Sequence, residues 1–134
     1  MKQLSKNFSL EEFTKSNTAE KHRVDNTPTA KNIEALQYLV DCLLQPLREL
    51  YGKPMSVNSG FRCDRLNILV NGARTSQHKK GEAGDIACDS PAELVKCLKQ
   101  SGLPYDQCGI YKTFVHLSLK LEGTNRQETF YGKY

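Results

Sequence analysis

The chain has 134 residues, of which 38% are hydrophobic and 25% are charged, and its formal net charge is +4. These values predict one globular domain over residues 1–134, large enough to bury a core without disulfides or structural metals. No apolar run approaches the roughly 20 residues that span a bilayer, and we expect neither membrane insertion nor a nucleic-acid partner.

The five cysteines are an odd number and contain no CxxC pair. The first residues, Met1–Lys6, lack the apolar segment of a secretory signal peptide. Both observations favour reduced thiols in a protein made in the cytoplasm. We expect a monomer.

The first predicted helix covers Phe8–Phe13, where Ser9 and Glu12 have the spacing of a capping box. The polar segment Thr14–Asp25 is predicted to be irregular. Apolar residues at helical spacing then predict the main core helix, from about Thr29 to Tyr51.

Two residues shape that long helix. Pro46 lacks a backbone donor and is expected to interrupt or kink the helix near Cys42, and Gly52 is a natural stop. The later elements alternate between types. They are a strand at Pro54–Asn58, a helix at Cys63–Val70, a strand at Gly84–Cys88, a helix from Ser90 to about Gln100, and a hairpin of Gln107–Tyr111 with Phe114–Leu119. This order predicts an α+β fold with a small, mainly antiparallel sheet and helices packed on it.

Three side chains in this pattern suggest a metal site. His78 and Asp85 are seven positions apart, too far to share an ion on one helix, but a turn at Gly81 into a strand would bring them together. His116 lies on a later strand. Two imidazoles and one carboxylate leave a fourth position for water, which is the ligand set of a catalytic zinc ion.

The segment Ser76-x-His78-x-x-Gly81-x-Ala83-x-Asp85, followed by a Val-His-x-Ser strand, resembles the peptidase M15 family, in the C-terminal domain type of its subfamily A. This family includes D-Ala-D-Ala carboxypeptidases and phage endolysins and has the Hedgehog/DD-peptidase fold. Ser59-Gly60-Phe61-Arg62 is similar to a further family motif.

The resemblance runs from about Phe8 to about Gln127. It implies zinc held by His78, Asp85 and His116, with Arg62 and Ser76 positioning a peptidoglycan stem peptide. It also implies that Asn67 supports the neighbouring loop. Such a protein acts at the cell wall if it is released from the cytoplasm, for example during phage lysis.

The general base is less evident. M15 peptidases carry an acidic residue shortly before the last histidine, but no residue from Cys108 to Val115 is acidic. Asp106 is our first candidate, because it begins the strand expected to pair with the His116 strand, and Glu82 is the second. Tyr111 is a candidate for orienting water or binding an oxyanion, although tyrosine is a poor base near neutrality.

Two functions therefore remain open at this point. One is a zinc peptidase that cuts peptidoglycan stem peptides, as a cell-wall hydrolase or phage lysin. The other is a catalytically weak relative that binds metal and recognises the cell wall or serves in a phage assembly.

Overall fold

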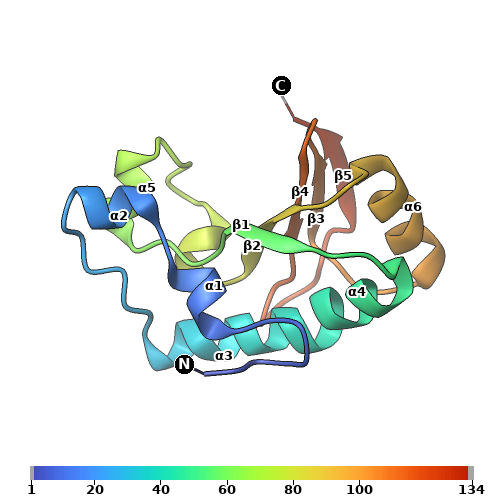
Figure 1. Ribbon diagram of the computed structural model, residues 1–134, viewed down its shortest axis with the longest axis horizontal. Coiled ribbons are helices and arrows are strands. Elements are labelled where there is room, and N and C mark those ends of the chain that lie inside the picture. Colours follow the sequence, from blue (N-terminus) through green and yellow to red (C-terminus); the bar gives the residue numbers. More distant parts are fainter. Residues whose placement is uncertain (1, 133–134) are drawn as a thin grey trace.

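The computed structural model describes residues 2–132 and has the predicted α+β architecture (Figure 1). Within these residues the sheet has five strands in the order β1-β2-β4-β3-β5. Neighbouring strands are antiparallel except β3 and β5, which are parallel. The strands are β1 Ser56–Ser59, β2 Ala83–Ala87, β3 Gln107–Ile110, β4 Phe114–Ser118 and β5 Glu128–Tyr131.

The long helix runs beneath the sheet in three consecutive parts, α3 Ala30–Leu39, the π-helical turn η1 Val40–Leu44, and α4 Gln45–Tyr51 (Figure 1). The predicted helix and its irregularity at Pro46 are therefore confirmed. The backbone N–H of Gln45 bonds to the carbonyl of Val40, five residues back, so the helix widens just before the proline. This wider turn lets the helix continue past a residue that lacks a donor.

The short helices are α1 Leu10–Thr14, α2 Asn17–Lys21, α5 Asp64–Leu69, η2 Gln77–Lys80 and α6 Pro91–Ser101. The predicted capping box is present before α1, because the Ser9 N–H donates to the Glu12 carboxylate at 2.7 Å. The prediction of an irregular segment at 14–25 is wrong at α2. Ser16 caps that helix by accepting a hydrogen bond from the Ala19 N–H at 3.1 Å.

One face of the sheet and the long helix enclose the core. Ile86, Val115 and Leu117 are fully buried on this face, and a side chain at Gly84 would touch Leu44 of the helix. Side chains alternate along a strand, so the neighbours of these apolar residues point to the opposite face. That opposite face carries Asp85 and His116.

Two further observations concern the thiols and the helices. All five cysteines are free thiols. In the part of the chain that the structure describes, no helix has the length and apolar character needed to cross a bilayer.

Candidate metal centre

The register of the sheet brings two of the predicted ligands together. Asp85 on β2 lies opposite His116 on β4. Ser59 on β1 lies opposite Asp85, and Gly109 on β3 lies opposite His116. Opposite residues share a face of the sheet, so Asp85 and His116 point to the same side.

The third ligand comes from the turn before β2. His78 lies on η2, where the hydroxyl of Ser76 accepts a hydrogen bond from the His78 N–H at 3.2 Å. Gly81 ends η2 with a φ of 81°, and a side chain there would lie 2.6 Å from the carbonyl of Asn32. Glycine is therefore required to turn the chain from η2 into β2, which places His78 over Asp85.

A backbone carbonyl fixes the orientation of His78. The Nδ1 atom lies 2.7 Å from the Gly60 carbonyl oxygen, and since a carbonyl only accepts, Nδ1 carries the proton. Nε2 is therefore the lone-pair nitrogen. It is buried and has no hydrogen-bond partner among the residues that the structure describes.

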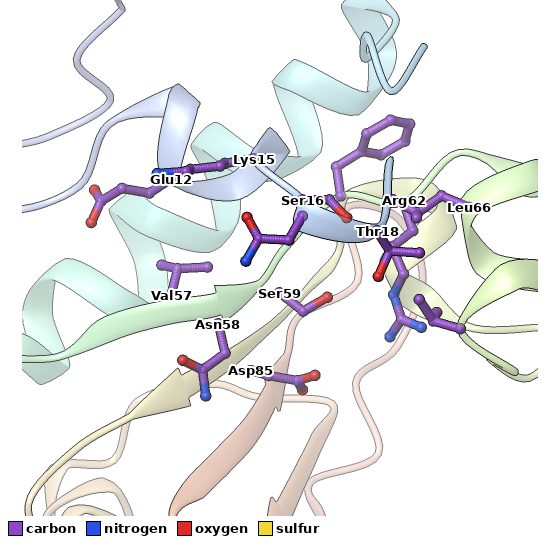
Figure 2. A pocket seen from close by; sticks show the side chains of 13 residues that line it. Glu12, Lys15, Ser16, Thr18, Val57, Asn58, Ser59, Arg62, Leu66 and Asp85 are labelled. Atoms are coloured by element: carbon purple, nitrogen blue, oxygen red, sulfur yellow. The ribbon is translucent and has the colours of Figure 1, made fainter. Parts of the chain in front are cut away.

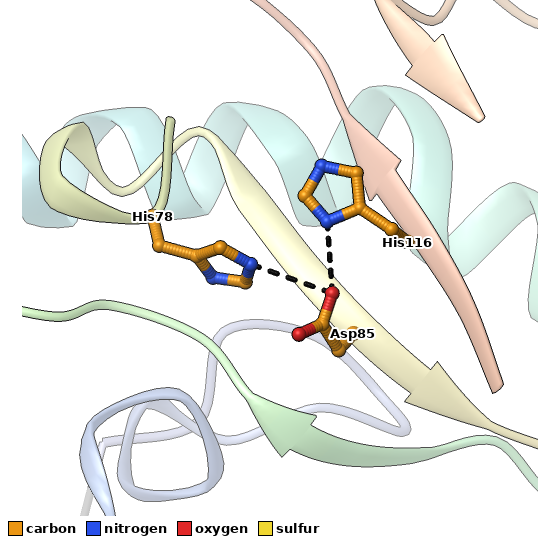
Figure 3. A group of neighbouring side chains, drawn as sticks. All are labelled: His78, Asp85 and His116. Carbon is orange, nitrogen blue, oxygen red and sulfur yellow. Dashed lines mark hydrogen bonds and ion pairs between the residues drawn. The ribbon is translucent and has the colours of Figure 1, made fainter. Parts of the chain in front are cut away.

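The three side chains converge on one point (Figure 3). An Asp85 carboxylate oxygen lies 3.4 Å from Nε2 of His78 and 2.8 Å from Nδ1 of His116. One ligand atom from each residue lies within 4.8 Å of the other two. Two imidazole nitrogens and a carboxylate oxygen fit a divalent metal such as zinc, and a metal would satisfy the unpartnered Nε2 atom.

Electrostatics and exposure are consistent with that use. Burial raises the pKa of Asp85, but the hydrogen bond with His116 and the favourable electrostatics of the two adjacent imidazoles outweigh burial and hold the pKa well below its ordinary value. The carboxylate is therefore ionised, as a ligand must be. His78 is 1% exposed, whereas the side chains of Asp85 and His116 are 19% and 16% exposed, so the site opens on their side.

A cavity of about 610 Å³ adjoins Asp85 and contains Arg62 (Figure 2). Nη1 of Arg62 donates to the Asn67 side-chain oxygen at 3.2 Å, and the Asn67 amide donates to the Ala73 carbonyl at 2.8 Å. Asn67 thus supports the loop after α5, as the resemblance implied, and also holds the guanidinium. Nε of Arg62 is buried and has no hydrogen-bond partner among residues 2–132.

Asp106 is not brought to this site, contrary to our expectation of a general base. It precedes β3 by one residue and lies three residues from Gly109, the partner of His116, or about 10 Å along the strand. It is fully buried, and the Arg126 guanidinium engages both of its oxygens at 2.7–3.2 Å. The structure therefore pairs the Asp106 carboxylate with Arg126 and not with the three converging side chains.

Glu82 is also held away from the ligands. One of its carboxylate oxygens accepts the Leu121 N–H at 3.3 Å, and it lines a different cavity together with Lys79 and Lys80. The Ser76 hydroxyl caps η2 by accepting the backbone N–H of His78, and this contact helps to position His78. The structure therefore shows Ser76 as a helix cap, and its contact with a substrate stays a prediction.

Tyr111 lies beyond the end of β3 and stacks on Phe114, with ring centroids 4.4 Å apart. Phe130 was not singled out from the sequence. The centroid of its ring lies 6.5 Å from that of Tyr111 and 6.5 Å from that of His116. The polar tail around Phe130 gave no strand signal. Its position depends on pairing with a strand about 20 residues earlier.

A family model described as Peptidase M15 matches residues 6–118, which include all three converging side chains and Arg62. No curated protein matches the chain.

Proposed function

The chain belongs to the peptidase M15 family, and from this we propose that it is a zinc-dependent peptidase acting on the stem peptides of peptidoglycan. The observation that carries the proposal is the buried, unpartnered Nε2 of His78 beside Asp85 and His116. A protein without a metal here would leave a buried polar atom unsatisfied, which is costly. The proposal includes a role at the cell wall, as a hydrolase or a phage lysin.

His78, Asp85 and His116 would hold the zinc ion. Zinc supplies a Lewis acid that polarises a carbonyl and lowers the pKa of water. The Gly60 carbonyl keeps the His78 ring in one tautomer, and the ionised Asp85 contributes negative charge. Arg62 would bind a substrate carboxylate or carbonyl through the donors that Asn67 leaves free.

The contacts of the acidic side chains favour a second function. Asp106 is engaged by Arg126 and Glu82 by a backbone amide, while Thr113, three residues before His116, is exposed. Among the described residues, no other acidic group joins the metal-ligand cluster. These observations support a metal-bound module that recognises the cell wall and is slow or inactive in cleavage.

One experiment separates the two functions. Zinc-loaded protein is incubated with purified peptidoglycan, with and without a chelator, and released fragments are identified by mass. The peptidase proposal expects cleavage that the chelator abolishes. Activity that appears only in Thr113→Glu would instead identify a binding module on a disabled peptidase site. If neither protein cuts while zinc stays bound, the peptidase proposal fails.

Arg62 gives a further test. Arg62→Lys retains the charge but loses the planar fork, so we expect KM to rise about 10- to 100-fold with zinc content unchanged. Arg65→Lys is the matched control, because Arg65 is exposed on the adjacent helix α5. An equal effect of the two substitutions would remove Arg62 from the substrate site.

A further inference from the structure

The row of paired residues that contains Asp85 and His116 continues across the sheet to β5. Asp85 pairs with His116, His116 with Gly109, and Gly109 with Phe130. These four residues form one line across β2, β4, β3 and β5, and all face the same side of the sheet. Phe130 lies beyond residue 118, where the match to the family model ends.

Gly109 makes room for the Phe130 ring. A side chain at Gly109 would lie 2.5 Å from the tip of that ring. The ring therefore lies across β3, directly beside His116, with ring centroids 6.5 Å apart. Phe130 is partly exposed, so the ring also forms surface next to the metal centre.

Two further aromatic residues extend this surface. Tyr111 meets Phe130 edge-on, at 6.5 Å and 84°, and stacks on Phe114 at 8°. All three are partly exposed. We name Tyr111, Phe114 and Phe130 the aromatic shelf.

The carboxylate of Glu128 lies next to the aromatic shelf. Glu128 lies two residues before Phe130 and on the same face, about 6.6 Å along the strand. Gln107 holds the Glu128 carboxylate at 2.8 Å, and Glu128 is exposed. The nearby Arg126 is paired with Asp106 at 2.7 Å, so its charge is already compensated.

The shelf and Arg62 lie on opposite sides of the metal centre. The cavity with Arg62 is lined by β1, whereas the shelf consists of Phe114 on β4, Tyr111 just after β3 and Phe130 on β5. His116 and Phe130 are two strand separations apart, about 10 Å, which is the length of about three extended residues. A peptide whose carboxyl end is at Arg62 would therefore reach the shelf one to three residues on the amino side of the scissile bond.

We propose that the aromatic shelf and Glu128 form a subsite for a diamino-acid side chain of the substrate. Its aliphatic stem would pack on the rings and its ammonium group would meet the ring faces and the Glu128 carboxylate. This inference rests on the proposed function, which supplies the direction of the peptide. The inference adds to that function a preference for substrates that contain a diamino acid.

The test uses zinc-loaded full-length protein and two synthetic stem pentapeptides, one with a free central lysine and one with that lysine acetylated. Calorimetry measures the dissociation constants, and mass analysis of the same samples reports cleavage. We expect the free-lysine peptide to bind about three- to fivefold more tightly at low salt. Glu128→Gln should reduce this preference, and the remainder is the part that the ring faces supply.

Phe130→Ala should weaken binding of the free-lysine peptide about five- to tenfold. Tyr131→Ala is the matched control, since Tyr131 is the next residue on β5 and is 78% exposed. Zinc content and melting temperature show whether the fold is intact, and Phe130→Leu replaces Phe130→Ala if the latter does not fold.

The outcomes separate the two proposals. Binding without cleavage by the parent would end the peptidase proposal and leave the subsite standing. Cleavage by the parent, with Phe130→Ala unchanged in binding and in kcat/KM, would end the subsite proposal alone. Equal affinity of the parent for the two peptides, or no binding of either, would also overturn the subsite.

Discussion

The pair of Asp106 and Arg126 offers a direct test of whether Asp106 is structural or catalytic. Asp106 is fully buried, and three contacts of 2.7–3.2 Å join it to the Arg126 guanidinium. Arg126 also donates its backbone N–H to Asp106 at 2.8 Å. We predict that Arg126→Ala and Asp106→Asn lower stability and leave activity nearly unchanged.

The magnitude follows from the contacts that each change removes. Removing one partner of a buried ion pair costs about 3–5 kcal/mol. The Arg126 side chain is 47% exposed, and Arg126→Ala keeps the backbone bond, so we expect a loss of about 2 kcal/mol. For a chain of this size, that corresponds to a fall of roughly 6–10 °C in melting temperature.

The pH dependence has a defined sign. Burial raises the pKa of Asp106, but hydrogen bonds and charge from Arg126 outweigh burial, so the net pKa is lowered. A lowered folded-state pKa contributes stability above the unfolded value, about pH 4, and that contribution is lost as the pH falls further. The difference in stability between parent and Asp106→Asn should therefore be full at pH 7 and shrink below about pH 4.

Thermal unfolding and peptidoglycan cleavage are measured on the same preparations. Lys31→Ala is the control, because the Lys31–Glu122 pair is exposed on both sides and its loss should not shift the melting temperature measurably. A general base contributes about 10²–10⁴-fold to rate. If Asp106→Asn melts like the parent but loses more than about a hundredfold in kcat, the structural assignment is wrong.

Two further predictions concern the metal centre and its neighbour. His78→Ala should reduce zinc affinity by more than about 100-fold, measured by competition with a chromogenic chelator. His22 is exposed, and His22→Ala is the control that should leave zinc affinity unchanged. Stoichiometric zinc retained by His78→Ala would contradict the ligand set. Gly72→Ala should raise KM without loss of zinc, because a side chain there would clash with the Asn67 oxygen and lie 2.8 Å from Nη1 of Arg62; an unchanged KM would show that Arg62 does not need Asn67 to hold it.

Local patterns predicted much of this fold. The cap at Ser9, the stop at Gly52 and the turn at Gly81 act over a few residues, so their consequences can be read along the chain. The three converging side chains were also predictable, because His78 and Asp85 belong to one motif of fixed spacing and His116 belongs to a second motif of the same family resemblance.

The parts that escaped prediction depend on contacts between distant segments. Strand β5 has only four residues, Glu-Thr-Phe-Tyr, in a tail that is otherwise polar, and it is placed by pairing with β3. The environment of the Asp106 carboxylate depends on Arg126, which lies 20 residues later in the chain. Sequence proximity to a ligand strand suggested a base, whereas the guanidinium that engages it could be found only from the folded chain.

The parallel strand β5 has a consequence for how the chain acquires its structure during synthesis. While residues 119–131 are still inside the ribosome, β3 has an open edge and Asp106 lacks its guanidinium. Residues 6–118, which the family match covers, would then be outside the ribosome, yet they would have to bury the Asp106 carboxylate without its partner. We therefore expect the final cooperative folding step to wait for Tyr131, and a fragment ending at Ser118 to be sensitive to proteolysis.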